Sequence, residues 1–111
     1  MRTSILASAL IAALAAPGLA SAAVDEAAAK AYAKQNDCFK CHAPDKTKKA
    51  ASYKKIAEKY KGKADAEEKL IKHLTTSTKV KLEDGTEEEH KALDKADLAK
   101  IKNIIEWIRS H

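Results

Sequence analysis

The residues that most constrain this chain are Cys38, Cys41 and His42, which lie within five positions of one another and include both of its cysteines. Thiols at this spacing suit a dithiol redox centre, half of a zinc site, or the covalent attachment of haem. A disulfide between the two cysteines is a further alternative, but it would close only a very small loop. The rest of the sequence has to decide among these chemistries.

The first 22 residues have the composition of a secretory signal peptide. A positive charge at Arg2 precedes a single apolar run, and the small residues Ala20 and Ala22 stand at the −3 and −1 positions of a cleavage site. The run is too short, and too closely followed by that site, to suggest a membrane span. The sequence therefore predicts a signal peptide at 1–22 and a single mature domain at 23–111. With no second apolar run, we expect a soluble periplasmic protein without stable membrane insertion.

Four stretches of the mature segment carry the apolar spacing or the end signals of an α-helix. The first is rich in alanine and begins with acidic residues, which favour a helix N-terminus. The second should end at Gly62, and the third should begin with a capping box made by Asp65 and Glu68. This pattern predicts an all-α fold. The expected helices cover residues 24–36, 53–60, 65–74 and 97–109.

The last of these helices has the clearest period. Asp94 and Asp97 both suit its N-cap, so its start is uncertain by about one turn. Its apolar residues fall on one face with Trp107 beside them, which indicates a helix that packs against the core. The predicted apolar face consists of Leu98, Ile101, Ile104, Ile105 and Ile108.

The stretch from 75 to 95 has no helical apolar stripe. A short hairpin around Asp84 and Gly85 fits part of it, although two strands alone are marginally stable. A long irregular segment in so small a domain usually has a function. This one carries His90, so we expect it to contribute to a site.

Haem is the chemistry that uses the whole motif. A thioredoxin-like dithiol would follow a strand in a βαβ unit, and the sequence shows no such unit. A zinc site would need two further ligands, His73 and His90, and would leave His42 without a role. In the haem interpretation Cys38 and Cys41 form thioethers with the two vinyl groups, and His42 binds the iron. The thin core expected of so short a chain also favours a large apolar cofactor.

With this motif, the alanine-rich first helix and the closing "IIEWIRS", the mature chain resembles the short class I cytochromes c of bacteria. The resemblance implies a small helical fold wrapped around one covalent haem c, with crossing N- and C-terminal helices. The small residues Ala29, Ala31 and Ala33 would lie opposite Trp107 at that crossing. It also implies a single-electron carrier rather than an enzyme, with other redox proteins as partners.

The sequence departs from this family at two places. Ala50 and Ala51 stand where many relatives have a Gly-Pro pair, but a backbone carbonyl there can still accept a hydrogen bond from the proximal histidine. The usual axial methionine is missing, because the only methionine is Met1 in the predicted signal peptide. We therefore expect His90 to be the distal iron ligand, with His73 as second choice. The remaining alternatives are His111, Lys79, Lys81, Lys91 and an open or water-bound iron.

The distal ligand decides the function. Two imidazoles favour fast electron transfer at a potential below that of His/Met relatives. An open position would instead give a five-coordinate haem protein that binds or senses carbon monoxide, nitric oxide or peroxide. A peroxidase is disfavoured because Arg109 is the only arginine outside the predicted signal peptide, which also argues against nucleic-acid binding. We expect a monomer that docks on acidic surfaces of redox partners, by electrostatic steering, through Lys46, Lys48, Lys49, Lys54 and Lys55.

Overall fold

The computed structural model describes residues 23–111, so the predicted signal peptide lies outside the described residues. The described part of the chain is predominantly helical, which confirms the predicted all-α fold class. No helix within the described residues is long and apolar enough to cross a membrane. Along the chain the elements are α1 (Glu26–Gln35), the 3-10 turn η1 (Cys38–Lys40), α2 (Tyr53–Tyr60), α3 (Ala66–Thr75), β1 (Lys79–Lys81), β2 (Glu87–Glu89), the 3-10 turn η2 (Lys95–Asp97) and α4 (Leu98–Arg109).

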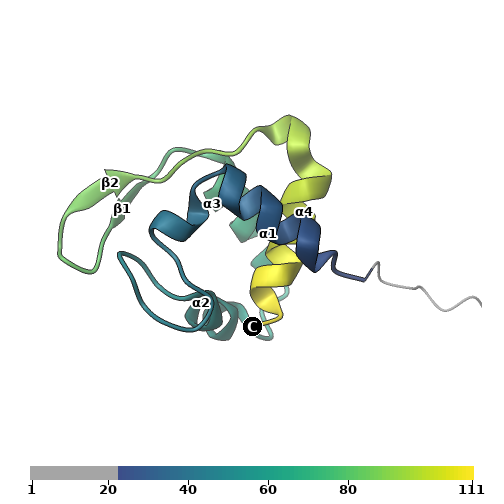
Figure 1. The fold of residues 1–111 in the computed structure, drawn as a ribbon, viewed down its shortest axis with the longest axis horizontal. Helices are drawn as coiled ribbons and strands as arrows, with labels where there is room; N and C mark the ends of the chain where they lie inside the picture. Colours follow the sequence, from purple (N-terminus) through teal and green to yellow (C-terminus); the bar gives the residue numbers. More distant parts are fainter. Residues whose placement is uncertain (1–22) are drawn as a thin grey trace, which may run out of the picture.

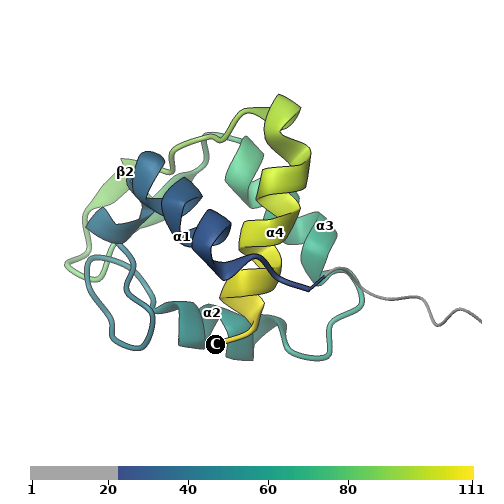
Figure 2. The same ribbon diagram turned by 45° about the vertical axis from the view of Figure 1, so that its right-hand side comes forward.

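The first and last helices cross and form the centre of the core (Figures 1 and 2). Ala29 and Ala33 are fully buried, one helical turn apart, so that the backbones of α1 and α4 approach closely. Ala31 was expected in this contact, but it is exposed, because a residue two positions from Ala29 points to the other side of the helix. Asp25 caps α1 by accepting a hydrogen bond from Ala28 N at 3.0 Å.

Helices α2 and α3 also pack against α4. Gly62 follows α2 with a left-handed φ of 72°, which confirms its predicted place just beyond the helix end. The capping box predicted for α3 is wrong. Asp65 precedes the helix but makes no side-chain cap. It binds Lys69 Nζ at 3.0 Å instead, and that exposed ion pair contributes little to stability.

Helix α4 buries most of its predicted apolar face. Leu98 is the exception, with 44% of its surface exposed, because it begins the helix at the edge of the fold. Both proposed N-cap residues have a role near this end. Asp94 caps η2 through Ala96 N at 2.9 Å, and Asp97 accepts a hydrogen bond from Tyr32 Oη at 3.3 Å.

Strands β1 and β2 form the predicted antiparallel hairpin, which extends to one side of the helices (Figure 1). Gly85 adopts a φ of 87° in the connecting turn, a conformation that favours glycine. Lysines of β1 lie opposite glutamates of β2, in the pairs Lys79–Glu89 and Lys81–Glu87. Such opposite charges stabilise the pairing.

The hairpin is fastened to the body of the protein by backbone hydrogen bonds. Glu83 N donates to Lys49 O at 3.0 Å, and Leu93 N donates to Leu74 O at 2.7 Å. Buried Leu82 and Leu93 anchor the same segment. The protein's own contacts therefore define the path of this segment.

Candidate functional site

The Cys-x-x-Cys-His motif forms a tight turn directly after α1. Its two cysteines are brought within one turn by η1, where Cys41 N donates to Cys38 O at 3.3 Å and His42 N to the same carbonyl at 3.0 Å. Both thiols are half-buried, are not joined in a disulfide, and line one large cavity together with His42. The turn therefore presents the whole motif to a single space.

The geometry disfavours the other chemistries considered for this motif. Burial raises the pKa of the Cys38 thiol, whereas a reactive dithiol needs a lowered pKa to supply thiolate. Within residues 23–111 no three Cys, His, Asp or Glu side chains are grouped so that they could hold a metal ion by themselves. The predicted zinc alternative therefore finds no support.

His42 is held by contacts from the loop that follows the motif. Its Nδ1 lies 2.6 Å from the backbone carbonyl of Ala51. Because a carbonyl only accepts hydrogen bonds, Nδ1 carries the proton and Nε2 is left with its lone pair. This confirms that Ala51 supplies the expected carbonyl without the family's Gly-Pro pair. The ring also stacks on Tyr53, with the planes inclined by 22°.

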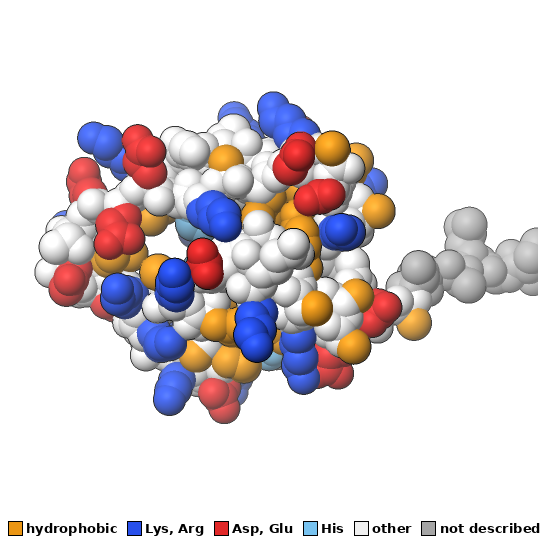
Figure 3. Space-filling view, turned by 45° about the horizontal axis from the view of Figure 1, so that its top comes forward, with side chains coloured by type: hydrophobic (Ala, Val, Ile, Leu, Met, Phe, Trp, Pro, Cys, Tyr) orange, Lys and Arg blue, Asp and Glu red, His pale blue; other side chains and the backbone are white. Residues whose placement is uncertain are grey.

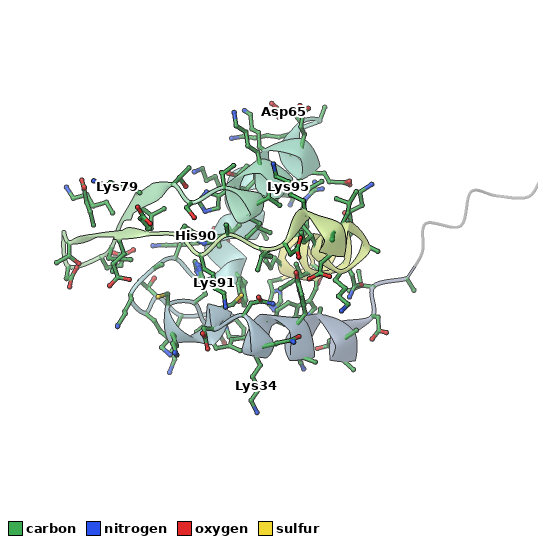
Figure 4. The ribbon with its side chains drawn as sticks, turned by 90° about the horizontal axis from the view of Figure 1, so that it is seen from above. Lys34, Asp65, Lys79, His90, Lys91 and Lys95 are labelled. Carbon is green, nitrogen blue, oxygen red and sulfur yellow. The ribbon has the colours of Figure 1, made fainter. Side chains whose placement is uncertain are left out.

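His90 lies on the segment between β2 and η2, above the middle of the molecule in the view of Figure 4. Its backbone N donates to Thr78 O at 2.8 Å, and its Nδ1 lies 3.1 Å from Lys91 O. The ring is half-buried, and this burial lowers the pKa of His90, so the neutral imidazole is favoured. Its Nε2 is therefore also available as a lone-pair donor.

The cavity brings His90 and His42 to face each other, with ring centroids 6.4 Å apart and planes inclined by 53°. His73, from the last turn of α3, lines the same space and lies 4.4 Å from His90 between centroids. Burial, and to a lesser extent the neighbouring imidazoles, lower the pKa of His73. The third alternative, His111, packs on Trp107 and does not line the cavity.

The lysines considered as iron ligands differ in whether they line the cavity. Lys81 and Lys91 line the cavity, whereas Lys79 does not. All five lysines expected around a docking surface are exposed, and of these only Lys55 lines the cavity. The face in Figure 3 shows basic and acidic side chains interspersed, with no single basic patch.

The cavity has a volume of about 790 Å³, within the range of sites for large organic ligands. Its walls are mainly aliphatic, and α3, α4 and the hairpin segment all contribute to them. Thiols for two thioethers and facing imidazoles with free Nε2 atoms form a donor set that fits haem c. The aliphatic wall residues include Ile56, Leu70, Leu74, Val80, Leu82, Leu93, Ile104, Ile105 and Ile108.

Several of these wall residues were not foreseen from the sequence. Val80, Leu82 and Leu93 belong to the stretch that has no helical period, so the helical pattern gave no signal for them. The available sign was an isolated apolar residue between charged neighbours, as at Val80 and at the buried Leu82.

A helical fold around one apolar cavity, with Cys-x-x-Cys-His in its wall, defines a c-type cytochrome. The family model described as "Cytochrome c" matches residues 26–111. The crystal structure of the class 1 cytochrome MtoD from Sideroxydans lithotrophicus ES-1 is 58% identical in sequence. That match covers 79% of this chain and 97% of the other, with a TM-score of 0.76. No curated protein matches the chain significantly.

The chain therefore belongs to the cytochrome c family, and it is a short class I cytochrome c. Its class is that of monohaem electron carriers, and its cofactor is one covalently bound haem c. The spacing of Cys38 and Cys41 fits the attachment motif of that cofactor.

Proposed function

We propose that the protein is an exported electron carrier whose haem is attached to Cys38 and Cys41 and ligated by His42 and His90. The observation that carries the proposal is the pair of imidazoles facing each other across the cavity at 6.4 Å. A bond between a metal and an imidazole nitrogen is about 2.0 Å long, so imidazoles on opposite sides of one metal ion have centroids roughly 6 Å apart. The observed separation suits a shared iron.

The hydrogen bonds of the two rings support the same assignment. Each Nδ1 lies within hydrogen-bonding distance of a backbone carbonyl, that of Ala51 for His42 and that of Lys91 for His90. Histidine ligands commonly donate their second ring N–H in this way, because it fixes the tautomer and orients the free nitrogen. The ring of His73 makes no hydrogen bond within residues 23–111. It is therefore the weaker choice as ligand.

Bound in this cavity, haem c supplies a one-electron couple between ferric and ferrous iron. Two imidazole ligands would hold the same coordination in both states, so little reorganisation would accompany electron transfer. Imidazole in place of a thioether would stabilise ferric iron and lower the potential relative to His/Met relatives. Leu74, Leu82 and Leu93 line the same cavity as His90 and would help to exclude water from the bound group. The five-coordinate alternative would require the ring of His90 to turn away from that of His42, which lies 6.4 Å from it between centroids.

The setting of this carrier is part of the proposal. A signal peptide at 1–22 would deliver the mature domain 23–111 to the periplasm as a soluble monomer. Partners would be other redox proteins, reached by electrostatic steering. Five lysines and three acidic residues line the cavity, namely Lys40, Lys55, Lys59, Lys81 and Lys91 together with Asp37, Glu88 and Glu89. The excess of positive charge near the haem site would favour acidic docking sites.

Spectra of the purified, unmutated holoprotein test the ligation. We expect a low-spin ferric signal of two imidazoles, no near-infrared band of sulfur ligation, and no binding of carbon monoxide by the reduced protein. Ready binding of carbon monoxide would favour the five-coordinate alternative. A sulfur band would contradict both interpretations.

A further inference from the structure

The two imidazoles that face each other across the cavity are held in different ways. His42 is fixed from outside its own turn, by the carbonyl of Ala51 nine residues away and by stacking on Tyr53. His90 has only the carbonyl of its immediate neighbour Lys91, at the longer distance of 3.1 Å. A hydrogen bond to the next residue restrains a ring weakly, since both groups move together.

His73 provides the ring contact that His90 otherwise lacks. The centroids of the two rings are 4.4 Å apart, which is van der Waals contact, and their planes are inclined by 46°. Within residues 23–111 the His73 ring has no hydrogen bond or ion pair, so packing against His90 is the main interaction of its polar ring. It is half-buried and lines the cavity.

Helix α3, which bears His73, is held by backbone hydrogen bonds against the segment that bears His90. Leu74 O, one residue beyond His73, accepts a hydrogen bond from Leu93 N at 2.7 Å. His90 N donates to Thr78 O at 2.8 Å. The first bond ties the end of α3 to the chain beyond His90, and the second ties His90 itself to the chain that follows α3. An imidazole that is borne on this fixed backbone and packs against the weakly restrained ring of His90 limits the orientations open to that ring.

We propose that His73 is a positioning residue that holds the plane of the His90 imidazole at a steep angle to that of His42. The observed angle between the two ring planes is 53°. The inference rests on the proposed ligation of the haem by His42 and His90. Orientation of axial ligands by neighbouring groups is one of the means by which a protein tunes a haem.

The angle matters because each axial imidazole interacts through its π system with one iron d orbital. Parallel rings act on the same orbital and separate it in energy from its partner. Crossed rings act on both orbitals and bring them closer together. The largest g value of the ferric low-spin resonance rises as these two orbitals approach each other, so this resonance reports the angle directly. His73 thereby adjusts the electronic state of the iron without binding it.

The test compares electron paramagnetic resonance spectra of the ferric holoprotein with those of His73→Ala and His73→Phe. In His73→Ala we expect the low-spin signal to persist with a shifted and broadened largest g value, because the His90 ring adopts a range of angles. Phenylalanine restores a ring against His90, so His73→Phe should recover a narrow signal close to that of the unmutated protein. Lys72→Ala, which alters an exposed residue of α3 that does not line the cavity, should leave the spectrum unchanged.

The outcomes separate this inference from the proposed function. A His73→Ala spectrum identical in position and width to the original overturns the positioning role, and so does a phenylalanine variant that behaves like alanine. Conversion of both His73 variants to high spin would identify His73 as the ligand and overturn the proposed ligation as well. An unmutated protein without the resonance of two imidazoles would contradict the proposed function before any variant is compared.

Discussion

The ring of His42 stacks on that of Tyr53, with centroids 5.6 Å apart and planes inclined by 22°. Tyr53 is almost fully buried, and it packs edge-on against Trp107 at 5.2 Å. The proximal histidine is therefore connected through one aromatic ring to the core formed by α4. Its orientation depends on this packing as well as on the carbonyl of Ala51.

This arrangement predicts different effects for two substitutions of Tyr53. Its hydroxyl is buried and has no hydrogen-bond partner among the described residues. Tyr53→Phe removes that group and keeps the stack, so the free energy of unfolding should change by less than about 1 kcal/mol. Tyr53→Ala removes the ring and should lower it by about 3 to 5 kcal/mol. Urea unfolding of the holoproteins measures both. Equal losses would show that the hydroxyl has a partner in the loaded protein.

A second prediction concerns the attachment of the cofactor. Because Cys38 and Cys41 line the cavity on one turn, each can anchor one vinyl group. Under denaturing conditions the intact mass should exceed that of the processed chain by one haem. Cys38→Ala and Cys41→Ala should each reduce the yield of mature holoprotein, whereas Lys40→Ala, in the same turn, should not. A mass equal to the bare polypeptide would contradict covalent attachment.

A third prediction concerns the crossing of the terminal helices. Asp25 N donates to Asn103 Oδ1 at 3.0 Å, and Asn103 Nδ2 donates back to Asp25 O at 2.9 Å. Asn103→Ala breaks both bonds and should lower the free energy of unfolding by about 1 to 2 kcal/mol. The neighbouring Lys102 makes only an exposed ion pair with Glu67, so Lys102→Ala should cost less than about 0.5 kcal/mol. Urea unfolding of the two variants should separate them clearly.

Much of the helical framework could be predicted from the sequence because its signals are local. The period of α4 and the glycine after α2 depend on residues within a few positions of one another. The errors arise where tertiary contacts decide. Leu98 fits the period of α4, but it stands at the first position of the helix, where neighbouring helices do not cover it. Asp65 has a capping sequence but an available lysine one turn on.

The sequence predicted the Cys-x-x-Cys-His motif more fully than it predicted the rest of the site. Cys38, Cys41 and His42 are adjacent in the chain, so their chemistry is visible directly. The approach of His73 to His90 joins α3 to the segment after β2, and no local pattern encodes it. The carbonyl of Ala51 was predictable only because a resemblance supplied its position. Long-range backbone bonds, such as Glu83 to Lys49, leave no mark on residue type.

A fourth prediction concerns electron transfer between proteins. Lys55 is exposed and lines the cavity, whereas Lys34 points away from the body of the molecule in Figure 4. Lys55→Glu should reduce the bimolecular rate with a strongly acidic donor, such as a reduced flavodoxin, by roughly threefold to tenfold at low ionic strength. Lys34→Glu makes the same change of charge and should have a smaller effect. Stopped-flow rates should converge as salt is added. Equal effects of the two variants would indicate that net charge, and not a docking surface, governs the rate.

The final prediction concerns the loss of the proposed distal ligand. His90→Ala removes the imidazole whose ring centroid lies 6.4 Å from that of His42, a distance suited to a shared iron. The ferric protein should become high-spin, and the reduced protein should bind carbon monoxide. His111→Ala is the control, since His111 lies outside the cavity. Absorption spectra with and without carbon monoxide provide the measurement.

The same variant separates the roles of the iron and of the chain in ordering the hairpin segment. Backbone bonds from Glu83, His90 and Leu93 do not depend on the imidazole, and Leu82 stays buried without it. We therefore expect amide hydrogen exchange at Leu82 and Leu93 to remain slow in His90→Ala. Rapid exchange there would mean that the iron bond, and not the protein's own contacts, holds the segment in place. A low-spin spectrum that survives the substitution would instead identify another distal ligand, with His73 the nearest imidazole at 4.4 Å.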